Sequence, residues 1–204
     1  MDALELLLNR RSSVVRQMTE PGPSPDELKS IVAAGIRVPD HGKLFPWRLQ
    51  VLDTSSQHAL GDVVAGLYAQ EHPDASTDEV HTERLRPQRA PVLVVVANRI
   101  QHDHPKIPAL EQMLSGGAVC QNLLNAAHAL GYTAQWLTEW PAYHADVKRA
   151  LGHSPDDDII GFVYIGSALE PPTERRRAQL EDVATYWDGP GVERMFPGVR
   201  PHQS

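Results

Sequence analysis

The sequence has few of the features that mark secreted, membrane-spanning or nucleic-acid-binding proteins. Its 204 residues contain one cysteine, Cys120, which excludes an intrachain disulfide framework and fits a reducing, cytoplasmic location. No apolar run reaches the roughly 18 residues of a membrane span, so we expect none. Residues 1–10 lack a basic start and are predicted to form a helix rather than a signal peptide. The net charge of −7 argues against nucleic acid as a partner.

The sequence motifs of several common enzyme classes are also absent. It has no glycine-rich dinucleotide motif, no P-loop lysine motif, no Gly-x-Ser-x-Gly elbow and no paired zinc-ligand motif. These absences argue against Rossmann dehydrogenases, P-loop NTPases, serine hydrolases and common zinc enzymes. His102 and His104 could begin a metal site, but no further ligand stands at a recognisable spacing, so we predict a polar loop and no metal. Cys120 lies in an apolar segment and is predicted to be a core residue rather than a nucleophile.

The hydrophobic pattern predicts one α+β domain over residues 1–204, with residues 167–204 as a C-terminal extension. Helices are predicted over residues 2–10, 25–37, 56–70, 108–130 and 141–151, and strands over residues 47–53, 91–97, 132–138 and 158–166. Residues 71–90 are charged and turn-rich, which indicates a mobile helix or flap. The extension carries apolar groups around Trp187, and we expect it to wrap a neighbouring subunit.

The predicted helix 108–130 is apolar over more than half of its circumference. Such a helix is buried, either in a core or at a subunit interface. Gly116 and Gly117 cost it about 1 kcal/mol each relative to alanine. They indicate either a close approach of the helix to another element or ligand, or a tolerated weakness.

Two polar segments are candidates for ligand binding. Arg10, Arg11 and Ser12 place guanidinium groups beside a hydroxyl group, which suits a phosphate, although the end of a solvated helix has the same composition. Residues 36–52 form a proline-rich loop with Arg37, His41, Lys43 and Arg48, which suits a planar anionic ligand. A surface loop anchored by a tryptophan explains the second segment equally simply.

Four segments together resemble the nitroreductase family, and more narrowly its compact bacterial branch of NAD(P)H nitroreductases. They are MDALELLLNRRS, VPDHGKLFPWRLQVL, LGYTAQWLT and IIGFVYIG. The resemblance implies a nitroreductase-like α+β fold, with a central mixed β-sheet flanked by helices in an intertwined homodimer. It also implies FMN at each subunit interface, reduced by NAD(P)H in a ping-pong reaction. A small organic acceptor, such as a nitroaromatic or a quinone, would then take the electrons.

The resemblance assigns phosphate and cross-subunit contacts to particular residues. Arg10, Arg11 and Ser12 match the family's first FMN-binding loop, where arginine and serine hold the phosphate. Arg37 and His41 match positions that reach the cofactor from the other subunit. No catalytic side chain is implied, because hydride transfer to a flavin needs no acid or base from the protein.

Further matches lie later in the chain. Trp136, Leu137 and Thr138 match a segment laid along the flavin, largely through its backbone. Arg175 and Arg177 resemble a basic pair near the C-terminus that contacts the phosphate. The family pair precedes Pro-Leu, where this chain has Ala-Gln-Leu.

One position departs from the resemblance. Many family members carry Lys or Arg where this chain has Val14, and that cation steadies negative charge at the N1–O2 edge of the flavin. Since the protein's task is to tune the cofactor, we hypothesise that Arg37, or else Arg16, supplies the charge. Two other functions remain open at this point: a flavin-binding carrier or redox sensor with little turnover, and a flavin-free interaction module with an acidic surface.

Overall fold

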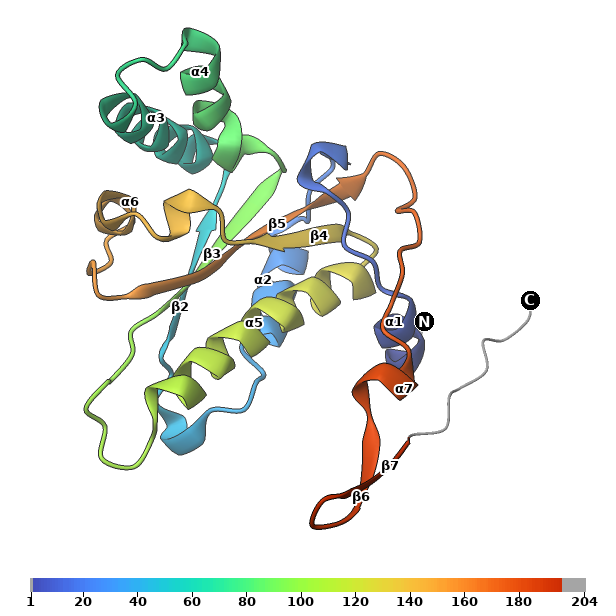
Figure 1. Cartoon of the computed structure of the whole chain (residues 1–204). Coiled ribbons are helices and arrows are strands. Elements are labelled where there is room, and N and C mark those ends of the chain that lie inside the picture. The colour runs from blue at the N-terminus through green and yellow to red at the C-terminus, as the bar shows by residue number, and fades with distance from the viewer. Residues whose placement is uncertain (1, 196–204) are drawn as a thin grey trace. The chain divides into compact units, whose positions relative to one another are not determined.

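The computed structural model divides the chain into two compact units, Met1–Pro172 and Thr173–Ser204. It describes residues 2–195. The first unit holds a five-stranded sheet with helices on both faces, and the second holds a short helix and a two-stranded hairpin (Figure 1). The single FMN-binding domain expected from the sequence stays a prediction.

The helices and strands of the first unit alternate along the chain. The α-helices are α1 (Ala3–Asn9), α2 (Pro25–Gly35), α3 (Thr54–Glu71), α4 (Thr77–Leu85), α5 (Ala109–Ala129) and α6 (Ala145–Ala150). The strands are β1 (Met18–Thr19), β2 (Trp47–Leu52), β3 (Val92–Asn98), β4 (Thr133–Leu137) and β5 (Asp158–Ala168). Short 3-10 turns are η1 (Val15–Gln17), η2 (His41–Lys43), η3 (Arg86–Gln88) and η4 (Trp140–Ala142).

The central sheet has the strand order β1-β5-β3-β2, and β4 pairs with β5 as well. This arrangement confirms the predicted α+β class. The mixed sheet implied by the resemblance is corrected in one respect: every pairing between strands of residues 2–195 is antiparallel. The reason is that β3 and β4, which run the same way, never pair with each other and contact opposite sides of β5.

The strand β3 builds the core on both faces of the sheet. Because successive side chains of a strand point to opposite faces, its apolar residues divide into two sets. Val92, Val94 and Val96 pack with residues of α2 and α5, whereas Leu93 and Val95 pack with residues of α3 and α6. The apolar run of residues 91–97 is therefore a strand covered on both faces, as its pattern predicts.

Local signals fix where the helices start. Ser24 and Glu27 form a capping box at the start of α2. A second capping box, Ser76 with Glu79, starts α4 inside the segment expected to be a mobile helix or flap. The helix predicted from residue 141 starts later, because Pro141 lies in η4 and the His144 side chain caps α6.

The second unit consists of α7 (Leu180–Val183) and the antiparallel pair β6 (Thr185–Gly189) and β7 (Val192–Met195). None of its described side chains is buried, and Trp187 is 71% exposed. An isolated hairpin of this kind is marginally stable in water. Its expected packing against a neighbouring subunit stays a prediction, and residues 196–204 of the extension lie outside the described residues.

No helix among residues 2–195 combines the length and apolar character needed to cross a bilayer. Cys120 is fully buried in α5, as predicted, and burial raises the pKa of its thiol to about 12. The same helix lies across one face of the sheet, with α2 beside it (Figure 1).

Candidate functional site

The loop of residues 10–15 runs beside the strand β4. The Thr133 hydroxyl donates to Ser13 Oγ at 2.7 Å, and both side chains are buried. One step further along, the Val15 backbone N–H donates to Gln135 Oε1 at 2.7 Å. These two contacts hold the loop in register with β4, so Arg10 and Arg11 lie near the start of β4, beside residues 131–133, and the 136–138 segment lies at the other end of the strand.

The predicted phosphate-binding residues lie at the start of this loop. Arg10 Nη1 donates to Ser12 Oγ at 3.2 Å, which draws a guanidinium and a hydroxyl group together. Arg10 and Arg11 both line a cavity of about 270 Å³. Guanidinium groups offer paired donors to phosphate oxygens, so the donor set of this corner fits a phosphate group.

His128, in the last turn of α5, contacts the backbone of the same loop. Its Nε2 lies 2.6 Å from the Arg11 carbonyl oxygen, and its Nδ1 lies 2.7 Å from the Leu124 carbonyl oxygen. Burial lowers the pKa of His128, although both carbonyl contacts act to raise it. The sequence alone does not reveal this role of His128, because its partner is a backbone carbonyl far away in the chain.

The segment of residues 136–138 uses its side chains for packing. The Trp136 indole lies against α5 near Gly117, and its Nε1–H donates to the Ile160 carbonyl oxygen at 2.9 Å. Leu137 packs against the core on the other face of the sheet. Among residues 2–195, β4 pairs with β5 alone, so its second backbone edge carries no strand. The contact of this segment's backbone with a flavin, which the resemblance implies, stays a prediction.

Arg37 and His41 lie on the loop between α2 and β2, which is fixed by several contacts. Asn122 Nδ2 of α5 donates to the Arg37 carbonyl oxygen at 3.0 Å. His41 Nδ1 lies 2.7 Å from Glu111 Oε2, in the first turn of α5. Both side chains are exposed.

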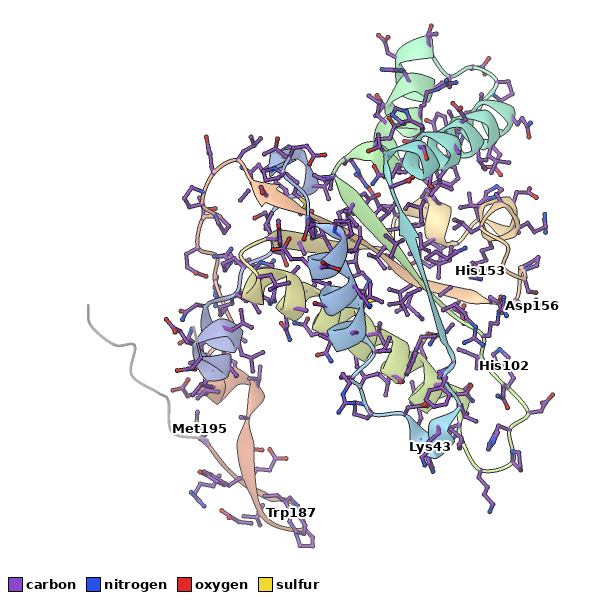
Figure 2. The ribbon with its side chains drawn as sticks, turned by 180° about the vertical axis from the view of Figure 1, so that it is seen from behind. Lys43, His102, His153, Asp156, Trp187 and Met195 are labelled. Carbon is purple, nitrogen blue, oxygen red and sulfur yellow. The ribbon has the colours of Figure 1, made fainter. Side chains whose placement is uncertain are left out.

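The tip of this loop has an unusual backbone. Gly42, Lys43 and Phe45 all have positive φ angles, of 69°, 56° and 46°. The Asp40 carboxylate accepts hydrogen bonds from two backbone N–H groups of the tip, which stabilises the turn. Figure 2 shows Lys43 on this loop and His102 on the loop between β3 and α5. The two loops meet where the Arg99 backbone N–H donates to the Pro46 carbonyl oxygen at 2.8 Å. Strained loops of this kind are common at functional sites.

The predicted residues of the first unit thus form two groups. Arg10, Arg11 and Ser12 lie beside the start of β4, which ends in the 136–138 segment, and Arg37 and His41 lie on a separate loop. The Arg11 loop contacts α5 at His128 and His41 contacts it at Glu111, and these two positions are about 25 Å apart along the helix at 1.5 Å per residue, whereas Asn122, which holds the Arg37 carbonyl, is about 9 Å from His128. One chain therefore does not bring all of the predicted residues together.

The remaining candidates stand apart from these groups. Arg175 and Arg177 belong to the second unit, where Arg177 Nε lies 3.9 Å from Glu174 Oε1. Their predicted phosphate contact stays a prediction. His104 Nδ1 accepts from the Ile107 backbone N–H at 3.0 Å and so shapes its own loop. Within residues 2–195, no three His, Cys, Asp or Glu side chains gather as a metal site would require.

Comparison with known proteins agrees with this architecture. A sequence profile described as "Nitroreductase family" matches residues 7–167. The chain belongs to the nitroreductase family. The resemblance predicted from four short segments is therefore confirmed over most of the chain.

Two relatives of this nitroreductase-family chain match it over most of its length. "Putative NAD(P)H nitroreductase YdjA" of Escherichia coli (strain K12) is 36% identical over 172 residues, which cover 82% of this chain and 88% of the relative. "Putative NAD(P)H nitroreductase" of Haemophilus influenzae is 31% identical over 187 residues, which cover 91% of this chain and all of the relative (100%).

Solved structures confirm the nitroreductase-like fold. A "Nitroreductase-like Family Protein" from Bacillus cereus superimposes with a TM-score of 0.76 at 19% identity, over 93% of this chain and 97% of that chain. A protein from Desulfovibrio desulfuricans described as a "putative nitroreductase in complex with fmn" gives a TM-score of 0.64 at 25% identity, over 86% of this chain and 91% of that chain.

Proposed function

We propose that this protein is an FMN-dependent oxidoreductase that uses NAD(P)H as its electron donor. The observation that carries the proposal is the alignment of the arginine-bearing loop with the open edge of β4, in a chain of the nitroreductase family. Bound FMN would accept a hydride from the nicotinamide and pass its electrons to a small organic acceptor, such as a nitroaromatic or a quinone, in a ping-pong sequence.

The chain's own residues would bind and orient the cofactor. The guanidinium groups of Arg10 and Arg11 and the hydroxyl of Ser12 would hold the phosphate, since their donors gather at one corner. The backbone of residues 136–138 would lie along the ring, because its edge carries no neighbouring strand. Arg175 and Arg177 would add charge at the phosphate.

Arg37 and His41 would complete the site from a second copy of the chain. Within one copy, His41 and the phosphate loop contact α5 at Glu111 and His128, about 25 Å apart along the helix, which favours a second copy as the source of His41 at the site. Exposed leucines support an interface at both places: Leu7 and Leu8 of α1 are 59% and 73% exposed, and Leu114 of α5 is 63% exposed. Large apolar patches mark association sites, and these exposed leucines would contribute to such a patch.

The visible spectrum of the purified protein tests the proposed cofactor and donor. We expect flavin absorption bands that bleach when NADPH or NADH is added without oxygen. A yellow protein that neither nucleotide bleaches would be a carrier or sensor instead. A colourless protein that does not bind added FMN would refute the proposal.

If FMN binds between two subunits, a substitution that separates the subunits should also release FMN. Replacing Leu114→Glu puts a charge on the exposed face of α5, where a partner would cover it. We expect the mass in solution, measured by light scattering, to fall from that of two chains to that of one, with loss of FMN. A wild-type protein of single-chain mass that retains FMN would contradict the shared site.

The charge beside the flavin N1–O2 edge is tested by substitution. Arg37→Ala should weaken FMN retention or lower the flavin midpoint potential, because a cation at this edge stabilises the reduced, negatively charged ring. Arg16→Ala is the matched comparison, since Arg16 is exposed and closer to Val14 in sequence. If Arg37→Ala leaves both quantities unchanged, this residue does not supply the charge.

A further inference from the structure

A network of two arginines and two glutamates lies directly after the 136–138 segment. Glu139 follows Thr138, and its carboxylate contacts both Arg86 and Arg89. Arg86 Nη1 lies 2.5 Å from Glu139 Oε1, and Arg89 Nη1 lies 3.1 Å from the same oxygen, while Arg89 Nη2 contacts Oε2. The Arg89 guanidinium thus grips both carboxylate oxygens, which fixes their orientation.

The two arginines are themselves held by other groups. Arg86 Nε donates to Glu83 Oε2 at 2.6 Å, in the last turn of α4. Arg89 Nε donates to the Arg86 carbonyl oxygen at 2.8 Å, and Arg89 Nη2 to the Tyr164 hydroxyl at 3.1 Å. The guanidinium of Arg89 also lies 4.9 Å from the centre of the Tyr164 ring. The two arginines that contact Glu139 are therefore held by α4, through Glu83, and by β5, through Tyr164.

The backbone of Glu139 has a conformation that residues other than glycine rarely adopt. Its φ is 20° and its ψ is 171°, close to a region that glycine alone occupies readily. Glutamate has a Cβ atom that opposes this conformation, and the local backbone contact of Glu139 is the Ala142 N–H, which donates to its carbonyl oxygen at 3.2 Å. A strained residue persists only when its surroundings hold it in place, and the paired arginines are the surroundings that contact its side chain.

We propose that Glu139 is a positioning residue for the flavin. The arginine grip on its carboxylate holds the strained peptide that ends β4, and this peptide sets the direction of the 136–138 backbone. The segment carrying Arg86 and Arg89 thereby controls how the flavin ring is held, although neither arginine needs to touch it. The inference rests on the proposed FMN-binding function, because the affected segment is the one that would face the ring.

Comparing the variants Glu139→Ala and Glu139→Gly separates the role of the backbone conformation at position 139 from the role of the carboxylate charge. Glu139→Ala removes the carboxylate and leaves a Cβ atom, so the peptide relaxes away from its strained conformation. Glu139→Gly also removes the carboxylate but accepts the same backbone angles without strain. We expect the FMN dissociation constant to rise about tenfold in Glu139→Ala and to stay within about threefold of wild type in Glu139→Gly. The flavin midpoint potential should shift in the alanine variant only.

The matched control is Asp146→Ala in α6, which breaks another carboxylate–arginine pair. Asp146 and Arg149 are about half exposed, at 50% and 53%, and lie outside the proposed site. This control should match wild type in both measurements. Arg89→Gln, which loosens the grip while keeping Glu139, should weaken FMN binding in the same direction as Glu139→Ala, and it replaces that variant if Glu139→Ala does not fold.

Two outcomes would overturn the inference. FMN affinity and potential that are unchanged in Glu139→Ala would show that the carboxylate positions nothing. Equal weakening in the alanine and glycine variants would show that the charge, not the backbone angle, is what matters.

A second measurement keeps the inference testable without flavin. If the wild-type protein binds no FMN, the proposed function fails on its own. Amide hydrogen exchange of the flavin-free protein then decides the inference. The N–H groups of residues 136–140 should exchange faster in Glu139→Ala than in wild type or Asp146→Ala, and equal rates would refute the role of Glu139.

Discussion

Replacing Gly161→Ala tests how the side chain of Trp136 is accommodated. A Cβ atom at position 161 would lie 2.0 Å from Trp136 Nε1 and 2.3 Å from Trp136 Cδ1, far inside van der Waals contact. The indole must then move, which breaks its hydrogen bond to the Ile160 carbonyl oxygen. Overpacking of a core costs about 1–3 kcal/mol, and one lost hydrogen bond about 1 kcal/mol. The free energy of unfolding should therefore fall by roughly 2–4 kcal/mol.

Thermal unfolding at fixed protein and cofactor concentration measures this effect. For a chain of this length, a loss of 2–4 kcal/mol lowers Tm by roughly 4–16 °C. The matched control is Gly66→Ala, in the middle of α3, where an added Cβ meets no atom within 4 Å. Alanine there should raise the free energy of unfolding by up to about 1 kcal/mol, because it favours the helix over the unfolded chain.

The two variants make the same chemical change and are expected to act in opposite directions. If Gly161→Ala unfolds at the same temperature as wild type, the indole does not occupy the position described. If Gly66→Ala is as destabilising as Gly161→Ala, backbone effects rather than the contact with Trp136 account for the loss.

Two further predictions concern titratable side chains. Burial acts to raise the pKa of Glu83, but hydrogen bonds from Arg86 and Trp140 outweigh it, and the pKa is lowered in the folded protein. Ionised Glu83 therefore stabilises the fold above its unfolded pKa of about 4.3, and this contribution is lost as the pH falls through the lowered value. Glu83→Gln should be less stable than wild type at pH near 7 in urea titrations, and the difference should shrink in acid; a constant difference would contradict the assignment. Cys120, with a pKa of about 12 and no exposure, should not react with a thiol reagent at pH near 8 until the protein is unfolded; rapid labelling of the native protein would contradict its burial.

The parts of the fold that depend on local patterns could be predicted from the sequence. The β-branched run of residues 91–97 identifies β3, and the capping box at Ser24 identifies the start of α2. The apolar circumference of α5 predicts its burial. Of the two glycines, Gly116 marks a close approach to the sheet, because a Cβ there would lie 2.5 Å from the Asn98 side chain, whereas a Cβ at Gly117 would lie 3.7 Å from the Trp136 side chain.

The parts that depend on contacts between distant residues could not be predicted. The charged, turn-rich sequence of residues 71–90 indicates a mobile helix or flap. Nothing in that sequence shows that Arg86 and Arg89 form ion pairs with Glu139, which lies 50 residues or more further along the chain. In the same way, His128 is one residue of a helix end until the fold places the Arg11 carbonyl beside it. The resemblance supplied candidate positions for both ligand groups, but not the interactions that hold them.

The length of α5 sets the distance between Glu111, which contacts His41, and His128, which contacts the Arg11 loop. Inserting one residue between Glu111 and His128 would rotate one end against the other by about 100° and lengthen the spacing by about 1.5 Å. Either His41 or the Arg11 loop would lose its partner. The number of residues between these two positions is therefore constrained by the two loops that pack against the same helix.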